Sequence, residues 1–138
     1  MIQKKLVSDC SEILGKIKSV ADQIIQIRLD TGKSLVFTTQ IARELKVDDN
    51  AFSILFLSKY GVTLERVFVM RVIEKVKELL VYTEQSFKQI ARTFGYNNPS
   101  SLSNLLKKYT GFTSTYFKQI RKNKLEIIRR QQTEQNQS

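Results

Sequence analysis

Apolar residues recur at intervals of three and four along most of this chain, with polar residues between them. This spacing is typical of helices with one buried face, so the pattern predicts an all-α fold. The clearest stripe lies just before Gly111, and its members fall at positions i, i+3, i+4 and i+7: Leu102, Leu105, Leu106 and Tyr109. Asn97 or Asn98 can cap this helix, and Pro99 is tolerated in its first turn. Gly111 closes it.

A shorter helix is predicted immediately before this one. Residues 86–89, Ser-Phe-Lys-Gln, have the Ser-x-x-Gln form of a capping box, so a helix begins there and runs to about Phe94. Gly95 can adopt the left-handed backbone conformation that ends a helix in a tight turn. Together the two helices and their turn form a helix-turn-helix.

The same unit occurs twice in the chain. Four segments of one copy match segments of the other: 41–43 with 90–92, 52–53 with 102–103, 55–56 with 105–106, and 61–63 with 111–113. The offset changes from 49 to 50, which one extra residue near the start of the second copy's later helix explains. The repeat predicts two helix-turn-helix subdomains.

Longer helices are predicted around and between the two copies. Thr63 begins a stretch without glycine or proline that reaches about Tyr82 and predicts a linker helix about 28 Å long. Helical spacing from Ser11 to Leu29 is followed by a polar loop. The predicted layout is an N-terminal helix and loop packing on the first copy over 1–36, the first helix-turn-helix over 37–62, the linker helix over 63–82, the second helix-turn-helix with a C-terminal basic helix over 83–130, and a disordered tail over 131–138.

The net charge of +10 lies mostly in the second half of the chain. Residues 1–70 carry ten Lys and Arg against eight Asp and Glu, whereas residues 71–130 carry thirteen against four. Part of this excess falls in a basic helix predicted from Tyr116 to about Arg130. A polyanion is the natural partner for such a surface, because each neutralised phosphate releases condensed counterions. Charge alone fits equally well a basic surface that only aids solubility.

Composition excludes several classes of protein. The chain has no histidine and one cysteine, Cys10, so it cannot form an internal disulfide or supply a Cys/His zinc site. It offers no nucleophile with a paired base, so we expect neither an enzyme nor a cofactor. No apolar run approaches the roughly 18 residues of a membrane span, and no signal segment opens the chain. We therefore expect a cytoplasmic protein with no membrane partner.

The second copy and its flanks resemble the DNA-binding domain of AraC-type (AraC/XylS) bacterial transcription regulators. The resemblance covers about residues 12–122 and is strongest over 71–122, where 73–80 resembles the family's connecting helix. The matching residues are Ser86-Phe87-Lys88-Gln89-Ile90-Ala91, Gly95-Tyr96, Leu102-Ser103-Asn104, Lys107-Lys108, Thr110-Gly111-Phe112-Thr113 and Tyr116-Phe117.

This resemblance implies two helix-turn-helix subdomains joined by the long helix, with recognition helices that enter successive major-groove segments of double-stranded DNA. It also implies regulation of transcription, commonly by recruiting RNA polymerase. Most members carry a separate ligand-binding or dimerisation domain, for which we expect no room in 138 residues. The chain is more similar to the short stand-alone, MarA/SoxS-like form of the family, which binds as a monomer.

Base reading needs side chains that point away from the core stripe and can hydrogen-bond to base edges. The second copy offers four such side chains: Ser100, Ser101, Ser103 and Asn104. Asn104 can pair bidentately with adenine, although the family often has Arg here. Without the resemblance these would be ordinary solvated positions. Six basic residues are better placed for phosphates, which position a protein without specifying sequence: Lys88, Arg92, Lys107, Lys108, Arg121 and Lys122.

The first copy departs from this pattern. Its later helix is expected to present four residues outward: Asn50, Ser53, Ile54 and Leu57. Asn50 and Ser53 can read bases, whereas Ile54 and Leu57 can only touch a thymine methyl group. The acids at 48 and 49 can cap the helix but would repel a nearby phosphate. A lysine, Lys46, stands where the second copy has glycine, so the turn is expected to differ.

Three explanations of these apolar positions remain open: weak DNA contact by the first copy, an apolar surface for a protein partner, or packing of Ile54 and Leu57 beneath the N-terminal helix. The alternative to a DNA-binding regulator is therefore a protein-interaction module, a degenerate helix-turn-helix that binds another regulator or RNA polymerase. Steep salt dependence of duplex binding would distinguish the two. RNA binding is less favoured, because the motif lacks the aromatic surface on which single strands stack.

Overall fold

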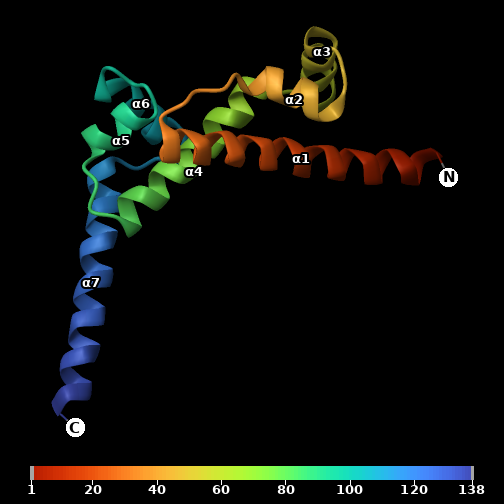
Figure 1. The fold of residues 1–138 in the computed structure, drawn as a ribbon. Coiled ribbons are helices and arrows are strands. Elements are labelled where there is room, and N and C mark those ends of the chain that lie inside the picture. Colours follow the sequence, from red (N-terminus) through yellow and green to blue (C-terminus); the bar gives the residue numbers. More distant parts are fainter. Residues whose placement is uncertain (1, 138) are drawn as a thin grey trace. The chain divides into compact units, whose positions relative to one another are not determined.

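A computed structural model describes the backbone of residues 2–137 and the side chains of residues 12–134. Over this range the chain consists of seven helices and contains no strand, so the all-α prediction is confirmed (Figure 1). In chain order the helices are α1 (Ile2–Thr31), α2 (Phe37–Leu45), α3 (Asp49–Tyr60), α4 (Leu64–Tyr82), α5 (Phe87–Thr93), α6 (Pro99–Thr110) and α7 (Ser114–Gln137).

The chain divides into two compact units, unit 1 with residues 1–72 and unit 2 with residues 73–138. The boundary falls within α4, so each unit contains one helix-turn-helix and one part of this helix. The first helix-turn-helix is formed by α2 and α3, and the second is formed by α5 and α6. Helix α4 has 19 residues, the length expected from the stretch without glycine or proline.

One hydrophobic cluster holds unit 1 together, and α1, α2, α3 and α4 all contribute to it. Its buried members are Ile17, Val20, Ala21, Ile24, Phe37, Ile41, Phe56 and Leu64. The four members from α1 follow helical spacing, which explains why one face of this helix covers the first helix-turn-helix. Phe37 in α2 also stacks on Phe68 in α4, with ring centroids 5.0 Å apart.

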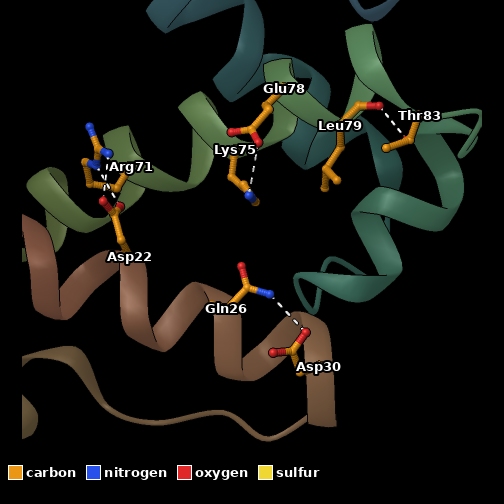
Figure 2. Close-up of polar contacts among 8 residues, drawn as sticks. All are labelled: Asp22, Gln26, Asp30, Arg71, Lys75, Glu78, Leu79 and Thr83. Carbon is orange, nitrogen blue, oxygen red and sulfur yellow. Dashed lines mark hydrogen bonds and ion pairs between the residues drawn. The ribbon is translucent and has the colours of Figure 1, made fainter.

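A polar contact joins α1 and α4 at the edge of the same unit. The guanidinium group of Arg71 donates two hydrogen bonds, each 2.9 Å long, to the two carboxylate oxygens of Asp22 (Figure 2). Bidentate pairing of this kind fixes the relative orientation of the two side chains. Because both side chains are partly exposed, we expect it to stabilise unit 1 by at most about 1 kcal/mol.

Unit 2 has its own buried residues, which come from α4, α5, α6 and α7: Ile73, Val76, Leu80, Ile90, Ala91, Leu102, Leu106 and Phe117. The end of α4 is marked by Thr83, whose hydroxyl donates a 2.6 Å hydrogen bond to the carbonyl of Leu79 (Figure 2). This bond satisfies one of the carbonyl groups that a helix leaves without a backbone partner at its C-terminus.

The first and last helices are longer than the sequence pattern predicts. Helix α1 includes two residues of the expected polar loop and ends at Thr31, just before Gly32 with φ of 76°. Helix α7 continues to Gln137 and so includes most of the segment expected to be a disordered tail. No glycine or proline interrupts α7, and glutamine, arginine and glutamate all favour helix, which accounts for its length.

Candidate nucleic-acid interface

The second helix-turn-helix has the local geometry that its sequence predicts. The Ser86 hydroxyl accepts a 3.1 Å hydrogen bond from the backbone of Gln89, and the Gln89 side chain accepts one of 2.9 Å from the backbone of Ser86. These two bonds complete the predicted capping box at the start of α5. Gly95 adopts the predicted left-handed conformation with φ of 82°.

The start of α6 is also capped as expected. The Asn98 side chain accepts a 3.0 Å hydrogen bond from the backbone of Ser100, which leaves Pro99 in the first turn. The sequence left Asn97 and Asn98 as alternative caps, and the structure decides for Asn98. At the other end, Gly111 takes the left-handed C-cap conformation. These features set where α6 begins and which side chains its faces carry.

Helix α6 buries one face and exposes a polar one. Leu102 and Leu106 are fully buried. Asn104 lies two residues from each of them, or about 200° of helix rotation, and its side chain is exposed. Ser100 and Ser101, one turn earlier, are exposed as well, whereas Ser103 is half-buried beside the core. The outward face therefore carries a short amide and hydroxyl side chains, which both donate and accept hydrogen bonds.

Exposed basic side chains lie on both helices of this helix-turn-helix. In the part of the chain whose side chains are described, Lys88, Arg92 and Lys107 are exposed and form no ion pair. Lys108 is also exposed, with its ammonium group 5.8 Å from the centre of the Tyr109 ring. Residues 86–112 hold four basic residues and no acidic one. The second helix-turn-helix therefore carries positive charge that no neighbouring carboxylate neutralises.

Of the two basic residues predicted for phosphate contact on α7, one is already engaged within unit 2. The Arg121 guanidinium donates a 3.4 Å hydrogen bond to the carbonyl of Val81 and lies 3.7 Å from the Glu84 carboxylate. Only 18% of its side chain is exposed, so its contacts join α7 to the end of α4. Lys122, the next residue, is exposed.

Lys118 lies in the same region, on the first half of α7. Its ammonium group donates a hydrogen bond to the backbone carbonyl of Gln85, which ties α7 to the segment before α5. Burial lowers the pKa of Lys118, and the nearby charge of Arg121 lowers it further, while Glu84 acts in the opposite direction. This region of α7 therefore has a structural role in unit 2.

The turn of the first helix-turn-helix matches that of the second at its left-handed residue but is one residue shorter. Lys46 adopts the left-handed conformation with φ of 56°, although a lysine at this position led us to expect a different turn. The backbone of Val47 donates a 3.0 Å hydrogen bond to Ala42, just as Tyr96 donates one of 2.9 Å to Ala91. The two turns therefore share this left-handed step although lysine stands in place of glycine, and the expected difference between them lies in their length.

The extra residue of the second copy lies in this turn. Between the left-handed residue and the cap of the later helix, the first copy has only Val47, whereas the second has Tyr96 and Asn97. Asp48 caps α3, and its carboxylate accepts a 3.0 Å hydrogen bond from the backbone of Ala51. This bond confirms that an acid at the start of α3 serves as a helix cap.

The outward face of α3 is apolar. Phe56 is buried, with 2% of its surface exposed, whereas Ile54 is 69% exposed and Leu57 is 46% exposed. This exposure excludes the explanation in which Ile54 and Leu57 pack beneath the N-terminal helix. Asn50 is exposed, and Ser53 is half-buried.

Leu55 is a residue whose exposure the sequence analysis missed. The repeat pairs it with Leu105, which is half-buried, yet Leu55 is 66% exposed. Four apolar residues in a row, 54–57, were the available signal, because one face of a helix cannot bury four consecutive positions. Residues 37–62 carry three basic and three acidic residues, so this helix-turn-helix has no net charge.

The described residues contain no group of three or more acidic, cysteine or histidine side chains that could hold a metal ion. None of their helices is long and apolar enough to span a membrane.

The structure is that of a helix-turn-helix protein with two such units. In the second unit, the later helix exposes a polar face. A family model described as "Helix-turn-helix domain", of the AraC type, matches residues 41–120, which is more than half of the chain. The chain belongs to this family of AraC-type helix-turn-helix domains. None of the curated proteins compared with the chain matches it.

Solved structures of regulators share the fold. An AraC-type transcriptional regulator from Chromobacterium violaceum is 18% identical, with a TM-score of 0.60, over 78% of this chain and 93% of that one. The C-terminal domain of the two-component response regulator yesN from Fusobacterium nucleatum is 24% identical, with a TM-score of 0.51, over 71% and 97%. The DNA-binding domain of AdpA, a global transcriptional factor solved in complex with a target DNA, is 14% identical, with a TM-score of 0.52, over 72% and 88%.

Family membership identifies the chain as a DNA-binding transcription regulator and not an enzyme.

Proposed function

We propose that the chain binds double-stranded DNA sequence-specifically, with α6 as its main recognition helix and unit 1 adjusting the choice of site. The observation that carries the proposal is the outward face of α6, whose exposed amide and hydroxyl groups share the helix-turn-helix with basic side chains that form no ion pair with any described residue. The AdpA domain, which has a similar fold, is described in complex with a target DNA, and this supports the same use here.

Asn104 is the side chain that we assign to base recognition first. It lies at the centre of the outward face of α6, opposite the two buried leucines. The side-chain amide of an asparagine can pair bidentately with adenine: its N–H donates a hydrogen bond to N7, and its carbonyl oxygen accepts one from the N6 amino group. Ser100, Ser101 and Ser103 have hydroxyl groups that accept or donate to either base pair, so we assign them supporting contacts.

We assign phosphate contacts to exposed basic residues of α5, α6 and α7: Lys88, Arg92, Lys107, Lys108 and Lys122. Such contacts set the position and orientation of a protein on the duplex but carry no sequence information directly. Arg121 was predicted to belong to this set, but its guanidinium is engaged by Val81 and Glu84, so we assign it a structural role first.

Unit 1 contributes less to affinity in this proposal, because its helix-turn-helix has no net charge to attract phosphates. Asn50 and Ser53 remain its hydrogen-bonding candidates on α3. Because one chain carries two helix-turn-helix units, a monomer has two helices to present to DNA. Contact with RNA polymerase is the regulatory step that we infer from the family.

A second candidate function is a protein-interaction module, and the exposed Ile54 and Leu57 favour it. In that case the chain would bind another regulator or RNA polymerase through α3, and DNA binding would be weak. Its affinity for duplex DNA would then show no steep dependence on salt.

The test is selection of bound sequences from a randomised duplex library, followed by footprinting of the enriched site at several salt concentrations. We expect an enriched site that spans two adjacent major-groove segments and binding that weakens steeply with salt. One short half-site would mean that only the second helix-turn-helix reads bases. No enrichment would contradict the proposal and favour the protein-interaction module.

A further inference from the structure

The outward face of α3 differs chemically from that of α6, although the two helices occupy equivalent places in the repeat. With the offset of 50, Ile54 corresponds to Asn104 and Leu57 corresponds to Lys107. An amide and an ammonium group in the second unit are thus replaced by two branched hydrocarbon side chains in the first. Both hydrocarbon side chains are exposed, at 69% and 46%.

We propose that Ile54 and Leu57 recognise the 5-methyl groups of thymine in the major groove, so that unit 1 selects a thymine-containing half-site. This inference rests on the proposed function, because it needs a chain that is bound to duplex DNA. It deepens that function by naming the base feature that the first unit reads.

The geometry of α3 places these two side chains where a groove-reading helix needs them. Ile54 lies two residues from both Phe52 and Phe56, or about 200° of helix rotation from each, and so points directly away from the core. Leu57 lies one turn further along the same face. Asn50 and Ser58, also exposed, lie one turn before and after Ile54.

The chemistry of the groove restricts what such side chains can recognise. Among the base edges of the major groove, the thymine methyl is the apolar feature, while the other atoms are hydrogen-bond donors or acceptors. Isoleucine and leucine side chains can form no hydrogen bond with those donors and acceptors. Placed over a G·C pair, Ile54 would displace water from donors and acceptors without replacing their hydrogen bonds, which is unfavourable. Placed over thymine, the Ile54 side chain and the thymine methyl group would both be removed from water, which is favourable.

The charges of the first helix-turn-helix fit a role in distinguishing one base sequence from another and not in raising the affinity for DNA in general. Its basic and acidic residues balance, and the Asp48 carboxylate at the start of α3 already accepts the backbone hydrogen bond of Ala51. A unit of this kind gains little from phosphates on a random duplex. Its contribution would therefore depend on which bases lie beneath Ile54 and Leu57.

The composition of this face favours DNA over a protein partner. The two apolar side chains are bordered by Asn50 and Ser58 on the same face, so the apolar surface is short and interrupted. Stable protein interfaces bury about 800 Å² on each partner, which is more than these two side chains and the exposed Leu55 between them can supply. Polar side chains beside an apolar pair match a base-pair edge, which also combines a methyl group with donors and acceptors.

The experiment compares two duplexes that carry the site enriched by the full-length chain. In one, the thymines of a single half-site are replaced by deoxyuridine, which pairs with adenine but lacks the methyl group. We expect replacement in the unit 1 half-site to weaken binding about fourfold for each contacted methyl, the effect of burying one methyl-sized group.

Variants then test which side chains are responsible. Ile54→Ala and Leu57→Ala should each lose part of the preference for the thymine duplex over the deoxyuridine duplex, and the double variant should bind the two duplexes with nearly equal affinity. The matched control is Leu55→Ala, because Leu55 is 66% exposed on the same helix but is rotated by about 100° from Ile54. This control should keep the full preference for thymine. Since all three side chains are exposed, circular dichroism should show folded variants in each case.

The failure of this inference can be distinguished from that of the proposed function. If deoxyuridine in the unit 1 half-site has no effect while the unit 2 half-site is still required, the inference is overturned and the proposed function stands. If Ile54→Ala keeps the full thymine preference but loses binding to purified RNA polymerase, the face is a protein surface and the inference is overturned. A library with no enriched site overturns both.

Discussion

Lys46 in the first turn adopts the same left-handed backbone conformation as Gly95 in the second, with φ values of 56° and 82°. In both turns the next residue donates a backbone hydrogen bond to the residue five positions earlier, to Ala42 in the first and to Ala91 in the second. Glycine adopts this conformation without a steric penalty, whereas a residue with a Cβ atom does not. The first turn is therefore strained at Lys46.

Replacing Lys46 with glycine should stabilise the protein. Relief of the left-handed strain favours the variant by about 1 kcal/mol, and the greater freedom of glycine in the unfolded chain offsets part of this gain. We expect a higher denaturation midpoint in urea. The matched control is Lys46→Ala, which removes the charged side chain but keeps the Cβ atom and should show no such gain. Equal stabilisation of the two variants would show that the lysine charge, and not the backbone strain, destabilises the wild type.

Asn104→Ala should reduce binding to the selected site by about 1–3 kcal/mol, the discrimination typical of one bidentate base contact. Binding to random duplex should change little, because phosphates supply that affinity. The measurement is a titration of both duplexes by fluorescence anisotropy. Asn123→Ala is the control, since Asn123 is an exposed asparagine on α7. An unchanged ratio of specific to random binding would contradict the role assigned to Asn104.

Lys107→Ala should weaken binding to specific and random duplexes alike. Loss of one phosphate contact should reduce the slope of log affinity against log salt by about 1. The control is Lys77→Ala, because the Lys77 ammonium already lies 2.7 Å from the Glu74 carboxylate. Measurement at four or more salt concentrations determines the slope for each protein. A Lys107→Ala variant with the wild-type slope would show that Lys107 does not contact phosphate.

Tyr96 should make stability depend on pH in alkaline solution. Burial raises the pKa of its phenol above the ordinary value of 10.0, so the unfolded chain loses this proton at a lower pH than the folded chain. The folded state then binds more protons, and the free energy of unfolding falls as pH rises above 10. Below that pH the contribution is fully present.

Urea denaturation at pH 9 and pH 11, with the wild type and Tyr96→Phe, measures this contribution. The phenylalanine variant cannot ionise at this position, so its stability should fall less over the interval. Lys118 acts in the opposite sense near its own lowered pKa, but it is present in both proteins and cancels in the comparison. Equal losses in the two proteins would mean that the phenol titrates normally.

Much of the fold follows from local signals in the sequence. The capping box at Ser86, the cap at Asn98 and the glycine that ends α6 at position 111 each involve residues a few positions apart, so the pattern identifies them without tertiary information. The repeat does the same for the two helix-turn-helix units. The polar outward face of α6 could be predicted for the same reason, since helical spacing separates Asn104 from the buried leucines.

Other features depended on contacts that local sequence does not specify. The left-handed turn at Lys46 is unfavourable for lysine alone and forms because the surrounding helices and the Val47 hydrogen bond require it. The exposure of Leu55, which the repeat pairs with the half-buried Leu105, was decided by which side of α3 faces the core at Phe56.

By itself, then, the sequence determined the helices, their caps, the repeat and the polar face of α6, because these depend on residues within a few turns of one another. Only the tertiary structure decided which basic residue is held in place, as Arg121 is by Val81 and Glu84, and which apolar residues of α3 remain in solvent. The physical reason is that burial and pairing depend on partners distant in the chain, and these become neighbours only when the helices pack.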